Sequence, residues 1–232
     1  MNFTVVWDNL PYLLWGAWPD GPLGGAALTL VLSVLSGLAS ALLGLGLGIA
    51  LAMLRNRWAH AALTAVLAFL RAIPVLLLIF WVYFLLPVAF GLDVPKLLTV
   101  VLALSLIGGA YLAHSVYSGI QSLPVGQWQA AAALGMNRWQ VMRHTILPQA
   151  LPMMLPSFMN QWISLIKDTS LAYVIGVGEL SFVATQVSNR VMIYPAEIFL
   201  AVAAIYYLFC ASLDWLSRRI GQAAQPGPSA SL

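Results

Sequence analysis

The sequence predicts an all-α integral membrane protein with five transmembrane helices. Hydrophobic residues make up 62% of the 232 residues and charged residues 7%, which is too few charges to cover a soluble protein of this size. The charged residues also divide the chain into apolar stretches of about 20 residues or more, the length that a helix needs to cross ~30 Å of hydrocarbon. One polar segment between these stretches has the pattern of a helix, a glycine and a second helix.

The five spans lie between the charged residues. Asp20 and Arg55 enclose the first span. The other four are expected at residues 72–92, 97–117, about 147–166 and about 195–216. Pro74 lies near the start of the second span, where a proline is tolerated because the first turn of a helix needs no N–H donor. Five spans place the two chain ends on opposite sides of the membrane.

Two of the spans carry small residues or prolines at a helical spacing. Small side chains recur every four residues in the first span, at Ser36, Ser40, Gly44 and Gly48. We expect this stripe to pack against another helix, with a role in permeation as the alternative. In the fourth span, Pro152 and Pro156 remove backbone hydrogen bonds. Either neighbouring helices absorb the resulting bend, or this span is a flexible gate.

The basic residues predict the orientation. They gather on one side if the N-terminus is outside: Arg55, Arg57, Arg71, Arg138, Arg143, Arg218 and Arg219. Because cytoplasmic loops are enriched in Lys and Arg, we place this side and the C-terminus in the cytoplasm. Residues 1–23 then form an external segment at the membrane interface, and residues 221–232 a disordered cytoplasmic tail. The first residues contain tryptophans and no basic cluster, which disfavours a cleaved signal peptide.

The polar segment between the third and fourth spans predicts two short helices joined by a glycine. Pro124 suits the first turn of a helix, and an Ala-rich run continues that helix to Leu134. Gly135 is then expected to adopt the left-handed conformation that ends a helix. Asn137 can cap the second helix, and Gln140, three residues later, completes a capping box. We interpret this insert as a contact site for another protein.

A second polar interruption follows the fourth span. It contains Lys167, Asp168, Thr169 and Ser170, followed by a glycine-bearing stretch that ends at Glu179. Charged groups are costly inside a membrane, so Lys167, Asp168 and Glu179 are candidates for a functional site. The alternative is that Lys167 and Asp168 form only a local ion pair at the interface.

Other sequence features exclude several classes of chemistry. The chain has no GxxxxGK[ST] phosphate-binding loop and no Gly-Lys dipeptide, so it does not hydrolyse a nucleotide through such a loop. Its single cysteine, Cys210, permits no intrachain disulfide and is expected to have a packing role. There is no GxSG motif to suggest an intramembrane protease.

Three segments resemble the membrane subunits of ABC importers. They are GIQSLPVGQWQAAAALGMNRWQ from Gly119, NQWISLIKDTSLAYVIGVGEL from Asn160, and Arg71-Ala72-Ile73-Pro74 with the apolar run after it. The first segment is similar to the cytoplasmic coupling loop of these subunits. All three are similar to permeases of the polar amino-acid uptake family, above all to glutamate/aspartate permeases. The resemblance extends from about residue 24 to residue 219.

The resemblance implies a transmembrane domain at residues 24–220 with a coupling loop at about 119–150. The residues expected to contact a cytoplasmic ATPase dimer are Gln127, Gln129, Ala130, Ala131, Leu134, Gly135 and Arg138. The candidates for the substrate path or its gate are Arg71, Pro74, Lys167, Asp168, Thr169, Ser170 and Glu179. Lys167 is expected to matter more than Arg71, which is placed at the cytoplasmic edge of the membrane.

The resemblance also implies the partners. They are the ATPase dimer, a second permease that is identical or similar, an external amino-acid-binding protein and the bilayer of a bacterial inner membrane. No nucleic acid is expected. ATP and Mg²⁺ belong to the ATPase, and this chain is expected to bind no cofactor or metal and to be no enzyme.

Two residues depart from the family's pattern. Gln129 stands where the coupling motif usually begins with Glu, so any ion pair of that Glu is lost. His114 stands where relatives often have Glu, and a structural role is expected for it. The implied function is import of a polar amino acid, with glutamate or aspartate favoured and glutamine or a basic amino acid as alternatives. The alternative of another class, a secondary transporter or channel, leaves the coupling segment unexplained.

Overall fold

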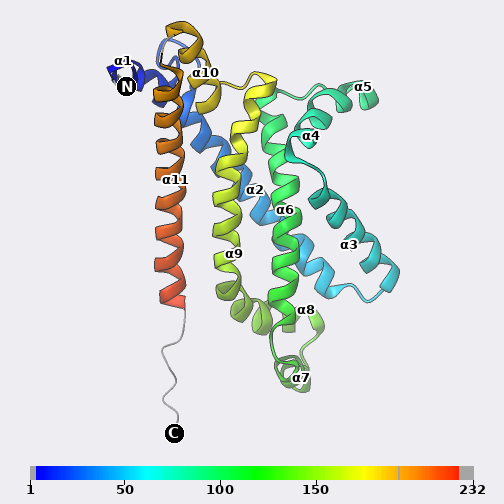
Figure 1. Cartoon of the computed structure of the whole chain (residues 1–232). Helices are drawn as coiled ribbons and strands as arrows, with labels where there is room; N and C mark the ends of the chain where they lie inside the picture. The colour runs from blue at the N-terminus through cyan, green and yellow to red at the C-terminus, as the bar shows by residue number, and fades with distance from the viewer. Residues whose placement is uncertain (1–3, 193, 225–232) are drawn as a thin grey trace.

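The computed structural model describes residues 4–192 and 194–224, with side chains to residue 219. Every named element in these residues is a helix (Figure 1). In chain order the elements are α1 (Thr4–Trp15), α2 (Gly25–Met53), α3 (Arg57–Ala72), α4 (Val75–Phe80), the π-helix η1 (Trp81–Leu85), α5 (Leu86–Phe90), α6 (Lys96–Gln121), α7 (Val125–Ala133), α8 (Arg138–Val141), the π-helix η2 (Met142–Ile146), α9 (Leu147–Asp168), the 3₁₀-helix η3 (Thr169–Ile175), α10 (Leu180–Val191) and α11 (Pro195–Ala224).

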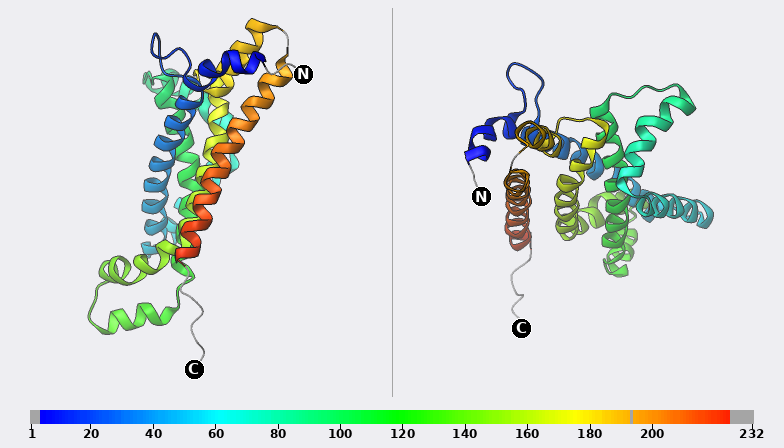
Figure 2. Two further views of the ribbon diagram at one scale, coloured as in Figure 1. Left: turned by 90° about the vertical axis from the view of Figure 1, so that its left-hand side faces the viewer. Right: turned by 45° about the horizontal axis from the view of Figure 1, so that its top comes forward.

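The long helices α2, α6, α9 and α11 run along the length of the molecule (Figures 1 and 2). Among the described residues, α2, α6 and the Pro195–Arg219 part of α11 are long and apolar enough to cross a membrane. They correspond to the first, third and fifth predicted spans. Helix α9, at the position of the fourth, has 22 residues but a more polar sequence. The count of five crossings therefore stays a prediction, because it depends on α9 and on the segment around Pro74.

The second predicted span, residues 72–92, contains one uninterrupted helical stretch, Val75–Phe90, but a helix that the sequence did not predict precedes it. Helix α3 already begins at Arg57, and it meets the α4–α5 segment at an angle of 102°. Ile73 and Pro74 have extended backbones, with ψ values of 134° and 136°, because a proline disfavours the helical conformation of the residue before it. Pro74 therefore breaks this segment. The bent pair is a broken span or a re-entrant loop by its geometry.

Each π-helix ends two residues before a proline. Pro87 is the second residue of α5, after η1, and Pro148 is the second residue of α9, after η2. A proline lacks the N–H that would close the preceding α-helical turn, and the wider π turn accommodates that loss.

The stripe of small residues in α2 packs against α6, as predicted. The Ser40 hydroxyl donates to the Leu104 carbonyl oxygen at 3.5 Å. A Cβ atom added to Gly44 would collide with Leu112, and one added to Gly48 would collide with Val116. Because α6 comes this close, only small side chains fit in α2 at the contact.

The two ends of the chain differ in part from the predicted boundaries. Helix α1 lies across the upper end of the bundle, where Leu13 is buried beside Leu180 and Ile198 (Figure 2). The predicted tail at 221–232 begins too early, because α11 continues through Ala224. Residues 225–232 of that tail lie outside the described residues.

Candidate functional site

The coupling segment has the predicted form of a helix, a glycine and a capped helix. Gly135 follows α7 and has a φ of +79°, in the left-handed region. The Asn137 side chain accepts a hydrogen bond from the Gln140 backbone N–H at 2.9 Å, and the Gln140 side chain accepts one from the Asn137 N–H at 2.8 Å. This reciprocal capping box begins α8 within two residues of the glycine. The segment forms the lower end of the molecule in Figure 1.

The surface of this segment contains most of the predicted coupling residues. Ala131 is the exception, because it is 4% exposed and packs with Ile120 and Val141. The others are exposed: Gln127, Gln129, Ala130, Leu134, Gly135 and Arg138. Leu134 is 82% exposed at the tip of α7 and leaves a large apolar side chain without cover from its own chain. Such a side chain at the end of a bundle suits burial by a partner protein.

Gln149 connects the coupling segment to α9. Its side-chain N–H groups donate to the Thr145 carbonyl oxygen at 2.7 Å and to the Gln127 side-chain oxygen at 3.4 Å. Met142 and Ile146 of η2 are fully buried in the same hydrophobic cluster as Ala131. These contacts connect α7 to the start of α9.

A polar cavity of about 290 Å³ lies between α3, α6 and α9. We call it the central cavity. It is lined by Arg71, Tyr111, Leu112, His114, Ser115, Ser157, Asn160, Gln161 and Ser164. The α6 residues and the α9 residues each recur at a helical spacing of three or four, so both helices turn a polar stripe toward the same space. The cavity is open on one side, where Tyr111, His114 and Asn160 are exposed, and its polar lining can hold a small polar molecule.

Arg71 contributes the positive charge of the central cavity. Its guanidinium carbon lies 5.3 Å from the centre of the Tyr111 ring, and the Tyr111 hydroxyl donates to the Arg71 carbonyl oxygen at 3.3 Å. The break at Pro74 leaves that carbonyl at the end of α3 without a partner inside the helix, and Tyr111 satisfies it. The Arg71 Nε is buried and has no hydrogen-bond partner among the described residues. Arg71 therefore faces a polar cavity between helices, and its predicted place at the cytoplasmic edge of the membrane stays a prediction.

A second polar cavity of about 320 Å³ continues from the central one toward the coupling segment. This lower cavity shares His114, Ser115 and Ser157 with the central cavity. Its remaining lining residues are Ser118, Gly119, Ser122, Met153 and Met154. The two cavities together follow α6 and α9 from the level of Arg71 to the last turn of α6, which gives a continuous serine-rich path.

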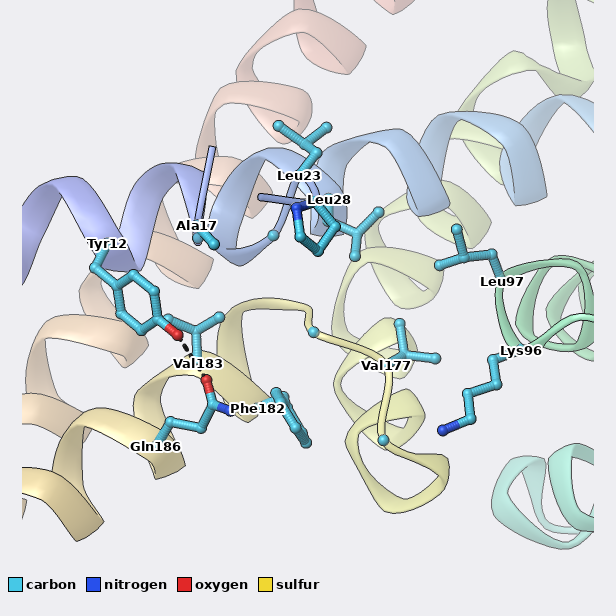
Figure 3. A pocket seen from close by; sticks show the side chains of 15 residues that line it. Tyr12, Ala17, Leu23, Leu28, Lys96, Leu97, Val177, Phe182, Val183 and Gln186 are labelled. Carbon is cyan, nitrogen blue, oxygen red and sulfur yellow. Dashed lines mark hydrogen bonds between the residues drawn. The ribbon is translucent and has the colours of Figure 1, made fainter. Parts of the chain in front are cut away.

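A third cavity, which we call the upper cavity, lies at the opposite end and is shown in Figure 3. It has a volume of about 330 Å³, and Lys96 is the charged residue in its lining. The Tyr12 hydroxyl donates to the Gln186 side-chain oxygen at 2.8 Å across its rim. Gly176 and Gly178 belong to this cavity, so the glycine-bearing stretch of the sequence lines space here. Most of the lining is apolar, as Val177, Phe182 and Val183 show in Figure 3.

The residues from Lys167 to Ser170 lie at the end of α9 and line none of these three cavities. The Thr169 hydroxyl donates to the Ile166 carbonyl oxygen at 2.7 Å, and the Ser170 hydroxyl to that of Lys167 at 2.6 Å. These bonds satisfy carbonyl groups where α9 becomes the 3₁₀-helix η3. Among the described side chains, Lys167 and Asp168 do not form the alternative ion pair. The structure thus separates Lys167 from Arg71.

Glu179 is fully buried and caps α10. Its carboxylate accepts hydrogen bonds from the Ser181 and Phe182 backbone N–H groups, both at 2.9 Å, and from the Tyr206 hydroxyl at 2.9 Å. Burial raises the pKa of this carboxyl to about 7, although these hydrogen bonds act in the opposite direction. Glu179 therefore ties α10 to α11 and has no access to the central cavity.

Sequence reasoning missed most of the residues that line the path. Four of them lie in or next to spans that the sequence predicts as apolar: Ser115, Ser157, Asn160 and Ser164. The signal that identifies them is a polar stripe at a spacing of three or four residues in two apolar helices. Only the packing of α6 against α9 shows that the two stripes face each other.

Comparisons with known proteins agree with this geometry. The family described as "Binding-protein-dependent transport system inner membrane component" matches residues 44–225. The glutamine transport system permease protein GlnP of Escherichia coli K12 is 38% identical over 222 residues, covering 94% of this chain and 95% of that protein. The arginine ABC transporter permease protein ArtQ of Haemophilus influenzae is 34% identical over 195 residues, covering 79% of this chain and 83% of that protein.

A solved structure shares the fold. It is described as the crystal structure of an amino acid ABC transporter with histidines, and it superposes with a TM-score of 0.82 at 26% sequence identity. The match covers 96% of this chain and 99% of the solved chain. The arrangement of helices is therefore the same over almost the whole length of both proteins.

Proposed function

The chain belongs to the binding-protein-dependent transport system inner membrane components, and we propose that it carries a polar amino acid through the central and lower cavities. Its similarity to amino-acid ABC transporter permeases is the premise of this proposal. The continuous polar path between α6 and α9 is the observation that supports this function most directly. An amino acid is a zwitterion, and its charges cannot enter a membrane without polar partners. Arg71 and the serine-rich lining supply such partners.

The energy for transport comes from a partner. A cytoplasmic ATPase dimer that binds ATP and Mg²⁺ docks on the exposed coupling residues, with Leu134 entering its surface. Closure of the dimer around ATP pushes on α7, and Gln149 and η2 transmit this displacement to α9. Because α9 lines both cavities, its movement changes access to the path. This chain itself takes no part in ATP hydrolysis.

The remaining partners follow from the topology. The N-terminus and the upper end lie outside and the C-terminus lies in the cytoplasm, as the basic residues predict. An external amino-acid-binding protein then delivers its cargo to the upper end, and a second permease completes the path. Five crossings of the bilayer, with α9 as the fourth and the bent α3–α5 segment as the second, fit this arrangement.

The substrate is a polar amino acid. Glutamate or aspartate, which the sequence resemblance favours, stays a prediction. The named relatives are permeases for glutamine and for arginine, so glutamine is an equally direct candidate.

The test is to fill the path with an apolar side chain in the complete transporter. We expect Asn160→Leu to reduce amino-acid uptake into proteoliposomes by at least about tenfold, because Asn160 lines the central cavity and Leu removes its hydrogen bonds. The matched control is Leu208→Ala, on the exposed side of α11, which leaves uptake unchanged. Normal uptake by Asn160→Leu contradicts the path. Uptake that continues without ATP supports the secondary-transporter alternative.

A further inference from the structure

The path is lined by a positive charge and by no negative charge. Among the residues that line the central and lower cavities, Arg71 carries a permanent positive charge and His114 is a histidine. The other lining residues are uncharged. The chain has seven carboxylates in all, at Asp8, Asp20, Asp93, Asp168, Glu179, Glu197 and Asp214. None of these carboxylates lines either cavity.

From this lining we propose that the path selects amino acids by side-chain charge: Arg71 and His114 admit uncharged and acidic polar side chains and exclude basic ones. The inference rests on the proposed function, because it assigns a substrate class to the same path. It concerns the permease itself, and it is independent of any selection by an external binding protein.

Arg71 is placed to hold the carboxylate that every amino acid has. A guanidinium binds a carboxylate through two parallel hydrogen bonds, and the buried Nε of Arg71 has no partner in the part of the chain that the structure describes. The α-ammonium group of the substrate needs acceptors. Asn160 and Gln161 offer amide oxygens on the opposite wall, and Ser164 offers a hydroxyl. These groups are common to all amino acids and do not discriminate between them.

The side chain of a substrate held in this way extends toward the junction of the two cavities. His114, Ser115 and Ser157 line that junction. Hydroxyl and imidazole groups can both donate and accept hydrogen bonds, so they satisfy a carboxamide or a carboxylate. A second ammonium or a guanidinium finds no carboxylate here and is repelled by Arg71. The central cavity is open on one side, but it lies between helices expected to cross the membrane, where an unpaired cation is costly.

Asp168 is a carboxylate on α9, the helix that lines both cavities. It follows Ser164 by one helical turn, and it stands beside Lys167, whose charge opposes its own. Asp168 lies outside both cavities. If a basic substrate used Asp168, the proposed selection would fail, so this residue belongs in the test.

The test measures equilibrium binding of radiolabelled L-glutamine, L-glutamate and L-arginine to the full-length chain in lipid nanodiscs, without a binding protein. We expect the wild type to bind glutamine and glutamate at least about tenfold more tightly than arginine. His114→Glu should tighten arginine binding by at least about tenfold, because it adds a carboxylate at the junction. Ser118→Asp, which adds one in the lower cavity, should also tighten arginine binding.

The matched control is His60→Glu. His60 packs against the Tyr117 ring at 5.6 Å and lines neither cavity, so the same added charge should leave the ratio of affinities unchanged. Equal binding of arginine and glutamine by the wild type would overturn the proposal, as would arginine binding that Asp168→Asn abolishes. Unchanged arginine binding in both carboxylate variants would also overturn it. A wild type that binds no amino acid at all would instead contradict the proposed path.

Discussion

At the scale of single residues, the tertiary structure separates two cations that the sequence presents as equivalent candidates. Arg71 lines the central cavity, and its Nε has no partner among the residues that the structure describes. Lys167, in contrast, is exposed at the end of α9 and lines neither the central, the lower nor the upper cavity. An unpaired buried donor is costly unless a ligand or water satisfies it. The cost is consistent with a role for Arg71 in holding a substrate carboxylate.

We therefore expect Arg71 to matter more for uptake than Lys167, whereas the sequence predicts the opposite. We predict that Arg71→Ala reduces uptake by at least about tenfold, the effect of losing one charge-assisted contact of about 1.4 kcal/mol or more. Lys167→Ala should change uptake by less than about twofold, because its ammonium is exposed to solvent or lipid headgroups. Initial uptake rates in proteoliposomes, normalised to the amount of transporter, distinguish the two. A larger loss for Lys167→Ala would return it to the path.

Glu179 gives a pH-dependent prediction. Its folded pKa of about 7 lies above its ordinary value of 4.5, so the folded state holds a proton that the unfolded state releases between these values. The stabilisation is complete below pH 4.5 and is lost as the pH rises through 7. From pH 5 to pH 8, the melting temperature of the wild type should fall relative to Glu179→Gln by roughly 5 °C.

Thermal unfolding of both proteins in one detergent at several pH values checks this prediction. The relevant quantity is the difference between the two melting temperatures, because other carboxylates titrate equally in both proteins. A constant difference from pH 5 to pH 8 would contradict a folded pKa of about 7 for Glu179.

At the scale of elements, the contact between α2 and α6 determines the positions of the cavities. Gly44 and Gly48 bring α2 against one side of α6, and α9 then faces another side, where the polar stripe of α6 lies. A wider spacing between α2 and α6 would shift α6 relative to α9. The small residues of α2 thus affect the position of the path, although they do not line it.

This contact can be tested with two glycines of the same helix. Gly44→Val should destabilise the protein by about 1–3 kcal/mol, or roughly 2–12 °C in melting temperature, because its side chain collides with Leu112. Gly46→Val is the matched control, since no atom lies within 4 Å of a Cβ at that position. Equal melting temperatures for the two variants would mean that α2 and α6 do not pack in this way.

The elements also show what can be predicted from sequence and what cannot. Local rules were sufficient for the coupling segment, because the conformation of Gly135 and the capping box of Asn137 depend on neighbours a few residues away. The bend at Pro74 was missed because an apolar run after a proline resembles the first turn of a span. The path was missed because each serine in α6 or α9 is compatible with ordinary packing in a membrane helix. Only the tertiary arrangement brings the two polar stripes together.

At the scale of the whole molecule, a polar path and an exposed coupling segment share α9. The lower cavity reaches Met153 and Met154 in the first half of α9, and Gln149, four residues earlier, holds the coupling segment. Through this connection, we propose, a partner at the lower end controls access to the cavities. Communication through the coupling segment is therefore expected to matter more for transport than any single contact in the path.

Gly135→Asp in the complete reconstituted transporter tests this claim most directly. The left-handed conformation costs a residue with a Cβ about 1 kcal/mol, and no atom of this chain lies within 4 Å of that Cβ, so the variant should fold and insert normally. The added side chain and charge lie on the surface proposed to contact the ATPase. We expect normal abundance in the membrane, together with loss of both amino-acid uptake and the stimulation of ATP hydrolysis by the loaded binding protein. Normal stimulation and normal uptake would contradict the assignment of this segment as the coupling site.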